Sequence, residues 1–490
     1  MSRRVRISPL ALFTLCIASA CFYPVSAQNT ADLQQTVLQV AKEQGMQHAT
    51  ISVCVYNTQN NRRLYSYNSE QSVIPASVNK IFTTGTGFAR LGAHFRFVTR
   101  LSMRGYIDRE GVLHGNLYII GGGDPLLGSY RYRQTAADSL FENWTKSLKK
   151  RGVRRVDGRV CYITSLFDDQ QVHDSWQWSD IGNYYGAGVS ALNFHENMFF
   201  VYFNGDKKMG QQVSIASIKP KNANILALSE VTTAAANTGD NVVIYGSPYG
   251  KERLCTGTIP IGSSNFAVRG ALASPAKCCA DMFATYLRTH DINVHSTSTQ
   301  TLTMPDSLQV VMDYYSTDYY TIAQYTNLTS NNVYAESILK YLGTLNNKQG
   351  SFASGVKEIS SYFKDKKLEA SGVRMVDGSG LSRLNRTTTD FICRYLNMIT
   401  REDYYDDFVH TLAENGKSGT AKNILPHLGT SAHIFLKTGT LDGVRAYAGY
   451  VKKDDGNTYS FAVIINNHEC STAQVNEKMN RILAKLVAIK

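Results

Sequence analysis

The most informative stretch of the chain is Pro75-Ala76-Ser77-Val78-Asn79-Lys80-Ile81-Phe82-Thr83-Thr84. A proline followed by an apolar run predicts a helix that begins near Ser77. Because residues three apart share one face of a helix, the Ser77 hydroxyl should lie beside the Lys80 ammonium. A hydroxyl becomes an effective nucleophile when a base takes its proton, and a lysine can be that base where burial and positive neighbours lower its pKa. Ser77 and Lys80 are therefore the first candidate catalytic residues.

The spacing Ser-x-x-Lys recurs in this chain, so the choice of Ser77 depends on its context. The apolar run after Lys80 predicts that this lysine is partly desolvated. The other lysines with this spacing are expected to be solvated, on surface helices or in loops. Those pairs begin at Ser147, Ser274, Ser337, Ser354 and Ser361.

A second motif, Ser330-Asn331-Asn332, combines a hydroxyl with a carboxamide two residues later. We expect it on a turn just before a helix that starts at Val333, where both side chains can point into one cleft. An ordinary helix N-cap is the alternative, since serine and asparagine are favoured in that position. Taken alone, this motif favours the N-cap.

A third motif, Lys437-Thr438-Gly439-Thr440, follows the strand-like residues Ile434-Phe435-Leu436. Alternation along a strand puts Lys437 and Gly439 on one face and the two threonines on the other. Gly439 leaves room for the backbone of a ligand, and lysine and threonine side chains can hold a carboxylate by charge and hydrogen bonds. The competing stretch Lys417-Ser418-Gly419-Thr420 lies among residues typical of a loop.

The order Ser-x-x-Lys, Ser-x-Asn, Lys-Thr-Gly is characteristic of the penicillin-recognising serine enzymes. With these motifs, and with a long gap between Ser77 and Ser330, the chain resembles the D-alanyl-D-alanine carboxypeptidase/endopeptidases among the class C low-molecular-mass penicillin-binding proteins. That family inserts extra domains in this gap, whereas simple β-lactamases have a far shorter one. The resemblance covers nearly the whole chain after its N-terminal segment. It includes residues 115–125, 176–197 and 377–383.

The resemblance implies a catalytic role for four residues of the first two motifs. Ser77 would be the acylated nucleophile and Lys80 its general base. Ser330 would relay a proton to the leaving amine, and Asn332 would hold Lys80 or the substrate amide. The backbone N–H groups of Ser77 and Thr440 would form the oxyanion hole, which is usually a large contribution to catalysis.

The resemblance also implies a set of substrate-binding residues. In the third motif, Lys437, Thr438 and Thr440 would bind the terminal carboxylate of the substrate, with Gly439 between them.

A pocket for the amine-bearing residue of a peptide stem is implied as well. Asp180 and Tyr185 have the family spacing for this pocket, and Arg383 matches a further pocket residue. Polar surface residues near a loop are the alternative. The chain departs from the family pattern at Asp442, whose extra carboxylate would favour a cationic substrate end or pair with Arg445.

An α/β (α+β) fold is expected, because both ends of the chain carry helix and strand patterns while short strand-like runs dominate the middle. By resemblance, residues 28–90 and 300–490 would together form a serine β-lactamase/DD-peptidase-like domain. One or two β-rich domains would be inserted at residues 91–299. Three consecutive domains are the alternative.

The composition indicates a globular protein. The chain has 490 residues, of which 43% are hydrophobic and 18% charged, so wholesale disorder is excluded. The formal net charge is +12, but the basic residues are scattered, which argues against nucleic acid as a partner. Mild basicity is compatible with an anionic cell wall.

The N-terminus has the pattern of a secretory signal peptide, residues 1–27. Arginines come first, an apolar run follows, and small residues precede the expected cleavage after Ala27. Cys21 follows Ala18-Ser19-Ala20, which loosely resembles a lipoprotein cleavage box, so a lipid anchor at Cys21 is an alternative. The mature protein is therefore expected to be exported, to a periplasm or cell envelope.

The cysteines and histidines give no sign of a metal site. Seven cysteines lie outside the signal segment, and no Cys-x-x-Cys or His-Glu-x-x-His motif occurs. Neither a metal nor another cofactor is expected. Cys255 could pair with Cys278 or Cys279, and buried free thiols are the alternative.

These observations predict an exported serine DD-peptidase. Its expected substrates are the D-Ala-D-Ala bond of peptidoglycan stem peptides and, as a second class, D-Ala–diaminopimelate cross-links. β-Lactam antibiotics would be covalent inhibitors. Two alternatives remain: a serine β-lactamase, for which no glutamate is obviously placed as the deacylating base, and a non-catalytic protein that binds the cell wall.

Overall fold

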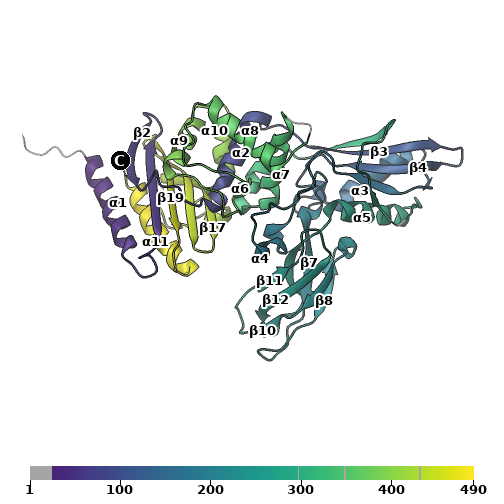
Figure 1. Ribbon diagram of the computed structural model, residues 1–490, viewed down its shortest axis with the longest axis horizontal. Coiled ribbons are helices and arrows are strands. Elements are labelled where there is room, and N and C mark those ends of the chain that lie inside the picture. Colours follow the sequence, from purple (N-terminus) through teal and green to yellow (C-terminus); the bar gives the residue numbers. More distant parts are fainter. Residues whose placement is uncertain (1–24, 296, 347–348, 430–431, 490) are drawn as a thin grey trace, which may run out of the picture.

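The computed structural model describes residues 25–489, apart from 296, 347–348 and 430–431. Most of the expected signal peptide, including Cys21, therefore lies outside the described residues, and residues 25–27 belong to the first helix, α1 (Val25–Ala41). In Figure 1, both ends of the chain lie in one domain, and the middle of the chain forms two further lobes. We call these the main domain, the first inserted lobe and the second inserted lobe.

The main domain is built on a six-stranded antiparallel sheet with the order β16-β17-β18-β19-β1-β2. The N-terminal and C-terminal segments of the main domain pair directly in this sheet. Strand β1 is antiparallel to β19, with Thr50 opposite Asn466. The strands are β1 (Thr50–Asn57), β2 (Arg62–Tyr67), β16 (Ala413–Glu414), β17 (Ala432–Leu441), β18 (Val444–Lys453) and β19 (Thr458–Asn466).

Helices cover both faces of this sheet, which is why β1 is apolar on both sides. Val53 and Val55 pack toward α1 and α11 (Thr472–Val487), whereas Cys54 and Tyr56 belong to the core on the opposite face. The helices of that opposite face are α2 (Lys80–Leu91), α6 (Tyr319–Thr329), α7 (Asn332–Thr344), α8 (Phe352–Asp365), α9 (Thr389–Ile399) and α10 (Tyr405–Thr411).

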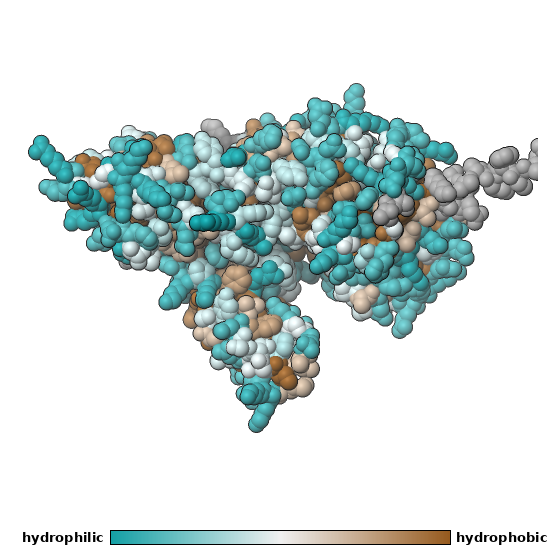
Figure 2. Space-filling view, turned by 180° about the vertical axis from the view of Figure 1, so that it is seen from behind, coloured by the Kyte–Doolittle hydropathy of each residue, from teal (hydrophilic) through white to brown (hydrophobic). Residues whose placement is uncertain are grey.

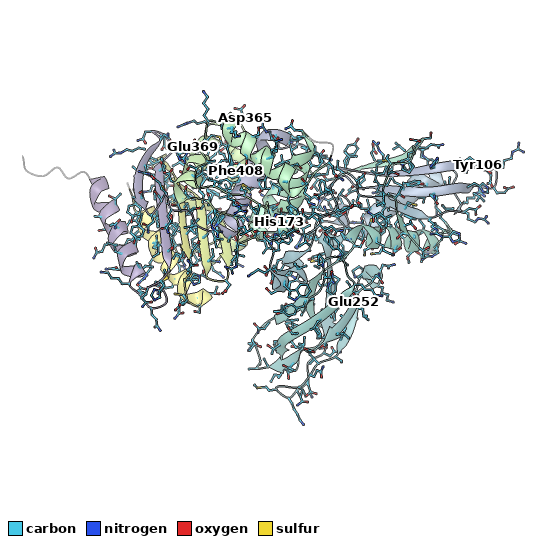
Figure 3. All side chains as sticks on the ribbon, in the orientation of Figure 1. Tyr106, His173, Glu252, Asp365, Glu369 and Phe408 are labelled. Atoms are coloured by element: carbon cyan, nitrogen blue, oxygen red, sulfur yellow. The ribbon has the colours of Figure 1, made fainter. Side chains whose placement is uncertain are left out.

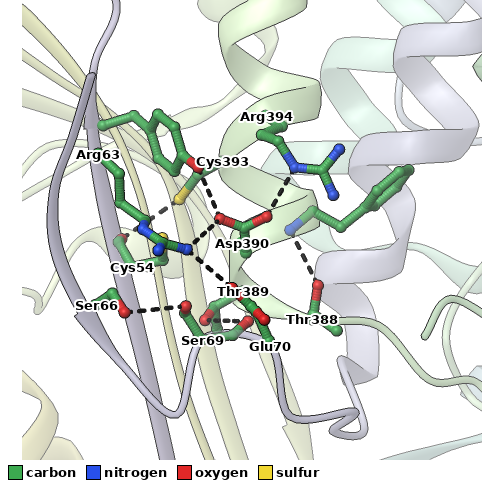
Figure 4. Close-up of polar contacts among 12 residues, drawn as sticks. Cys54, Arg63, Ser66, Ser69, Glu70, Thr388, Thr389, Asp390, Cys393 and Arg394 are labelled. Carbon is green, nitrogen blue, oxygen red and sulfur yellow. Dashed lines mark hydrogen bonds and ion pairs between the residues drawn. The ribbon is translucent and has the colours of Figure 1, made fainter. Parts of the chain in front are cut away.

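A polar cluster on α9 ties the N-terminal hairpin to the C-terminal part of the chain (Figure 4). Asp390 accepts hydrogen bonds of 2.7 Å from the Tyr56 hydroxyl and from Arg394, and Arg63 lies 3.3 Å away. Burial raises the pKa of Asp390, but the bonds from Tyr56 and Arg394 outweigh it and hold that pKa below the usual value. The chain segments before and after the inserted lobes are thus locked together by charge as well as by the sheet.

The first inserted lobe contains a mixed sheet with the order β14-β6-β4-β3-β15. Two long helices pack in this lobe, where only strand-like runs are identified in the sequence and a β-rich domain is predicted. In α3, Leu140, Trp144 and Leu148 are buried at helical spacing. The elements are β3 (Val98–Ile107), β4 (Val112–Ile120), β5 (Arg155–Val156), β6 (Val160–Ile163), β14 (Thr299–Gln300), β15 (Gln309–Tyr315), α3 (Ala137–Lys150) and α5 (Pro275–Thr289).

The pairing of β15 bears on where the main domain resumes. This strand runs antiparallel to β3, with Tyr315 opposite Val98. The following helix, α6, packs against α2 in the main domain. We therefore propose that the main domain resumes after Tyr315 rather than at residue 300.

The second inserted lobe consists of two small sheets, with the orders β13-β7-β8 and β10-β12-β11. The short helix α4 (Trp178–Ile181) lies where this lobe meets the main domain (Figure 1). Figure 2 shows that hydrophilic residues cover most of the face seen from behind. The strands are β7 (Met198–Phe203), β8 (Ile215–Lys219), β9 (Leu226–Ser229), β10 (Thr232–Ala234), β11 (Asn241–Tyr245), β12 (Glu252–Pro260) and β13 (Phe266–Ala271).

Three further observations concern the described residues. Each cysteine outside the N-terminal segment is a free thiol, and six of the seven are buried, so Cys255 does not pair with Cys278 or Cys279. No three His, Cys, Asp or Glu side chains come together in an arrangement that could hold a metal ion. None of the described helices is both long and apolar enough to cross a membrane.

Candidate active site

Ser77 and Lys80 lie together at the start of α2. Ser77 belongs to a 3-10 turn, Ala76–Asn79, and Lys80 is the first residue of the α-helix. Lys80 Nζ donates to Ser77 Oγ at 3.0 Å and to Asn332 Oδ1 at 2.6 Å. It also donates to the backbone oxygen of Ser379 at 2.8 Å. These bonds use all three donors of the ammonium and fix it beside the hydroxyl.

Burial makes Lys80 a suitable base. The side chain is fully buried, and desolvation lowers its pKa to about 7. The carboxylates of Glu336 and Asp377 act in the opposite direction, but they do not cancel the effect of burial. Burial and the charge of Asp377 raise the pKa of Glu336, whereas hydrogen bonds from the backbone N–H groups of Gly378 and Ser379 oppose this and favour its charged form. Near neutral pH the neutral amine is therefore readily available.

Glu336 is a residue that the sequence motifs do not reveal. Its two carboxylate oxygens accept the backbone N–H groups of Gly378 and Ser379, at 2.8 and 2.7 Å. The same loop presents the Ser379 carbonyl to Lys80. Glu336 follows Asn332 by one turn of α7, so i,i+4 spacing on one helix face is the signal that could have found it.

The Ser-x-Asn motif lies at the junction of α6 and α7. Ser330 ends α6 with a left-handed backbone, φ 56° and ψ 38°, and its side chain makes no hydrogen bond within the described part of the chain. Asn332 bridges two elements, since its Nδ2 donates to the Tyr185 backbone oxygen at 2.7 Å while its Oδ1 accepts from Lys80. The N-cap role belongs instead to Asn331, which accepts from the Tyr334 N–H.

The Lys-Thr-Gly motif lies on β17, beside the nucleophile turn. Gly439 packs so closely that an added Cβ would lie 2.7 Å from the Pro75 oxygen and 3.1 Å from the Ser77 nitrogen. The missing side chain therefore makes room for the nucleophile turn itself. This close approach brings β17 next to the Ser77 backbone.

The other side chains of this motif differ in exposure. Lys437 is fully buried and donates to the Thr438 backbone oxygen at 2.8 Å. Burial lowers its pKa well below the usual value, and the charges of Lys80 and Arg445 add to this effect. Thr440 is exposed, and Arg445 donates to its hydroxyl.

The competing stretch at residues 417–420 has a structural role here. Thr438 Oγ1 donates to Thr420 Oγ1 at 2.7 Å, so the loop supports β17 from behind. One expectation about these spacings was wrong: Lys340, which follows Ser337 with the same Ser-x-x-Lys spacing, is fully buried rather than solvated. It forms an ion pair of 2.6 Å with Asp168.

Asp180 and Tyr185 come from the junction with the second inserted lobe, and Arg383 comes from a loop of the main domain. Burial raises the pKa of Asp180, while the charge of Arg383 and a hydrogen bond from Tyr185 partly oppose this. Burial also raises the pKa of Tyr185, to about 12. Arg383 donates to the Asp442 backbone oxygen at 2.9 Å, so the exposed Asp442 lies beside Arg383.

The lobes meet close to this pocket. His173 marks their junction in Figure 3, and Ser175, two residues later, is hydrogen-bonded to Ser382 of the Arg383 loop at 2.6 Å. Trp176 donates from its ring to the Asp377 carboxylate at 2.9 Å. The segment that leads to Asp180 is thereby fixed to the loop behind Lys80.

A cleft of about 1000 Å³ connects these groups. It continues past Thr440 toward the start of α11, at Thr472 and Val475. Lys437 and Thr438 lie behind its wall. The predicted residues that line it are Ser77, Asp180, Tyr185, Ser330, Asn332, Arg383 and Thr440.

Comparisons with known proteins agree with the family resemblance of the sequence. Residues 33–486 match the model of the D-Ala-D-Ala carboxypeptidase 3 (S13) family. A D-alanyl-D-alanine carboxypeptidase of an Actinomadura species is 25% identical, over 94% of this chain and 86% of its own. The D-alanyl-D-alanine carboxypeptidase DacB of Haemophilus influenzae is also 25% identical, over 87% of this chain and 86% of its own.

Solved structures show the same fold. The crystal structure of penicillin binding protein 4 from Haemophilus influenzae superposes with a TM-score of 0.78, at 23% identity. The superposition covers 94% of this chain and 99% of that one. The expected fold class and the family resemblance are thus confirmed, and the protein is an enzyme. The chain belongs to the D-Ala-D-Ala carboxypeptidase 3 (S13) family.

Proposed function

We propose that this protein is an exported serine DD-peptidase that hydrolyses the D-Ala-D-Ala bond of peptidoglycan stem peptides through an acyl-enzyme on Ser77. One observation carries the proposal. A fully buried lysine, Lys80, holds its Nζ 3.0 Å from Ser77 Oγ, and burial lowers its pKa to about 7. A hydroxyl next to a neutral amine is the arrangement that nucleophilic catalysis requires.

In the acylation step, Ser77 Oγ attacks the carbonyl carbon of the scissile bond. Neutral Lys80 takes the hydroxyl proton as the new C–O bond forms. The carbonyl oxygen becomes an oxyanion, which the backbone N–H groups of Ser77 and Thr440 stabilise. The close packing of Gly439 on the Ser77 backbone supports this pairing, because it puts β17 beside the nucleophile turn.

Collapse of the tetrahedral intermediate breaks the C–N bond. Ser330 passes a proton to the leaving amine of D-alanine and receives one from Lys80, which becomes neutral again. The ester on Ser77 then reacts with water, with Lys80 again as the base. Asn332 keeps Lys80 in position through the bond of 2.6 Å between its Oδ1 and the lysine Nζ.

The substrate is held at two ends. Thr440, with Lys437, Thr438 and Gly439 behind it, is the proposed site for the terminal carboxylate, where the positive charge of the lysine attracts an anion. Asp180 and Tyr185 are the proposed site for the third residue of the stem peptide, whose amine would pair with the carboxylate. In this arrangement the charge of Arg383 opposes the effect of burial on the pKa of Asp180.

The same nucleophile would react with β-lactams. A relative, penicillin binding protein 4 from Haemophilus influenzae, has been crystallised in complex with a β-lactam, and its fold is shared by this chain. We propose that β-lactams acylate Ser77 and form a slowly hydrolysed ester. Export of the protein is proposed from the signal-peptide pattern of residues 1–27, with the peptidoglycan as its partner.

The test follows two readouts on the purified protein. A stem peptide that ends in D-Ala-D-Ala should release D-alanine, and benzylpenicillin should add its mass to Ser77 in a stable adduct. Rapid loss of the adduct would identify a β-lactamase instead. Absence of both D-alanine release and an adduct would refute catalysis and favour a wall-binding protein.

A further inference from the structure

A second cavity, of about 310 Å³, adjoins the cleft on the side of the second inserted lobe. It shares Ser330, Asn332, Tyr184 and Tyr185 with the cleft, so these residues border both spaces. Two arginines, one from each inserted lobe, also line this cavity. The mechanism proposed above uses neither of them.

One of these arginines, Arg131, is already neutralised. It is paired with the buried Glu196, with 2.9 Å between Nη2 and Oε2, and its Nε also donates to this carboxylate. Ser129 and Tyr334 donate to the same carboxylate at 2.7 and 3.1 Å. Arg131 therefore stiffens the wall of the cavity without giving it a net charge.

The other arginine, Arg269, keeps its charge available. It lies on β13, partly buried, with its guanidinium 3.7 Å from the centre of the Tyr184 ring. Within the described part of the chain its guanidinium forms no hydrogen bond or ion pair with a protein group. Asp240 is close enough to be influenced by its charge but not to pair with it. A half-buried guanidinium without a counter-ion favours binding of an anion.

The position of Arg269 is fixed by the same segment that carries Asp180 and Tyr185. The N–H of Ala271, at the end of β13, donates to the Gly182 oxygen at 2.9 Å, and Asn183 pairs with Gly270. Tyr184 and Tyr185 contact each other edge-on, with 5.5 Å between ring centres. One rigid turn thus presents Tyr185 to the cleft and Tyr184 to Arg269.

We propose that this cavity binds a carboxylate of the leaving stem peptide when the enzyme cuts a peptidoglycan cross-link, with Arg269 as the charged group. The proposal rests on the proposed function, in which Ser330 passes a proton to the leaving amine. We put the cavity on the leaving-group side because Ser330, which borders both spaces, passes its proton to the leaving amine; Tyr185 borders both spaces as well, so an acyl-side cavity is one outcome of the test. A single leaving D-alanine has its carboxylate at Thr440, whereas a leaving stem peptide is longer and carries further carboxylates that can reach Arg269.

The experiment compares three reactions of the full chain: D-alanine release from a monomeric stem peptide, cleavage of a cross-linked stem-peptide dimer, and acylation by benzylpenicillin. Arg269→Gln should lower kcat/KM for the dimer about tenfold, as expected when a partly exposed charge-assisted hydrogen bond is lost. The other two reactions should be unchanged. Arg269→Lys, which keeps the charge, should recover part of the dimer activity. Arg288→Gln removes the charge of an exposed arginine on α5 and is the matched control.

Each other outcome overturns the proposal. An equal loss on monomer and dimer would put the cavity on the acyl side, and a loss in benzylpenicillin acylation as well would make Arg269 structural. No loss on the dimer, or a wild-type enzyme that cuts the monomer but never the dimer, would remove the role of the cavity while leaving the DD-peptidase function intact. Failure of the wild type in all three reactions would instead refute the proposed function.

Discussion

Two walls of the cleft are built in different ways. The nucleophile wall, Ser77 with Lys80 and Ser379, is part of the main domain, and its lysine is fully buried with every donor used. The recognition wall, Asp180 with Tyr185 and Arg383, lies at the junction of the lobes and is only partly buried. Electrostatic effects are strong in a desolvated site and weak in a solvated one.

This contrast separates chemistry from selectivity. A change in the nucleophile wall should affect every substrate, because each of them reacts with the same hydroxyl. A change in the recognition wall should affect only substrates that extend to it. The following predictions test that division.

Ser77→Ala should have the largest effect. Without the nucleophile, D-alanine release should fall about 10⁴-fold or more, and the benzylpenicillin adduct should disappear from the mass spectrum. Ser147→Ala, which alters a partly buried serine on α3 with the same Ser-x-x-Lys spacing, is the control and should behave like the wild type. A label that persists in Ser77→Ala would show that another residue is the nucleophile.

Lys80→Arg should follow, with a loss of about 10³-fold on both peptide and benzylpenicillin, because a guanidinium cannot give up its proton to serve as a base. In the wild type, acylation should decline as the pH falls below about 7, since Lys80 then becomes protonated. Stopped-flow acylation across pH measures both effects, and circular dichroism checks the fold. Substantial activity in Lys80→Arg would mean that the lysine acts only through its charge.

Asp180→Asn should distinguish the two walls. A charge pair that loses one partner costs about 2 kcal/mol at the lower end, appropriate to a half-buried group, which corresponds to about 25-fold in kcat/KM. This loss is expected for a stem peptide with an amine-bearing third residue, whereas acylation by benzylpenicillin should be unchanged. Asp174→Asn alters an exposed carboxylate of the same segment as a control. Equal losses on both substrates would mean that Asp180 supports the active site as a whole and that the two walls do not have separate roles.

The nucleophile wall was largely predictable because its residues are joined by local spacing. Ser77 and Lys80 are neighbours on one helical turn, and the strand pattern before Lys437 correctly indicated β17. The contact between Lys80 and the Ser379 carbonyl was not predictable, because a backbone oxygen has no signature in the sequence. The close approach of the nucleophile turn to Gly439 was not predictable either, since only the three-dimensional structure shows which backbone lies beside it.

The inserted lobes were less predictable. The regular burial of Leu140, Trp144 and Leu148 identifies α3 once the structure is known, but short strand-like runs dominate its surroundings. The pairing of β15 with β3 joins segments far apart in the chain, which local periodicity cannot reveal. The position of Arg269 near the cleft was also not predictable from local patterns, since it depends on how β13 contacts the turn that carries Tyr184.

The smallest predicted effect concerns Glu336, which lies behind the nucleophile wall. Lys80 is surrounded by Ser77, Asn332 and the Ser379 carbonyl, with the carboxylates of Glu336 and Asp377 nearby. The Glu336 charge raises the pKa of Lys80, so Glu336→Gln should lower that pKa. The acidic limb of the acylation profile should therefore shift to lower pH.

At neutral pH the same variant should lose only about threefold in benzylpenicillin acylation, because a glutamine can still accept one of the two backbone N–H groups of the 378–379 loop. The pH profile is the readout that separates the two possible roles of Glu336. If the carboxylate changes the pKa of Lys80, the acidic limb of the acylation profile moves. If it only positions the 378–379 loop, the acylation rate falls at every pH and the limb stays in place. Glu358→Gln, a buried carboxylate on α8 that pairs with Arg90, is the control. A shift of the acidic limb to higher pH would contradict the prediction that the Glu336 charge raises the pKa of Lys80. The nucleophile wall would then consist only of the groups in direct contact with Lys80.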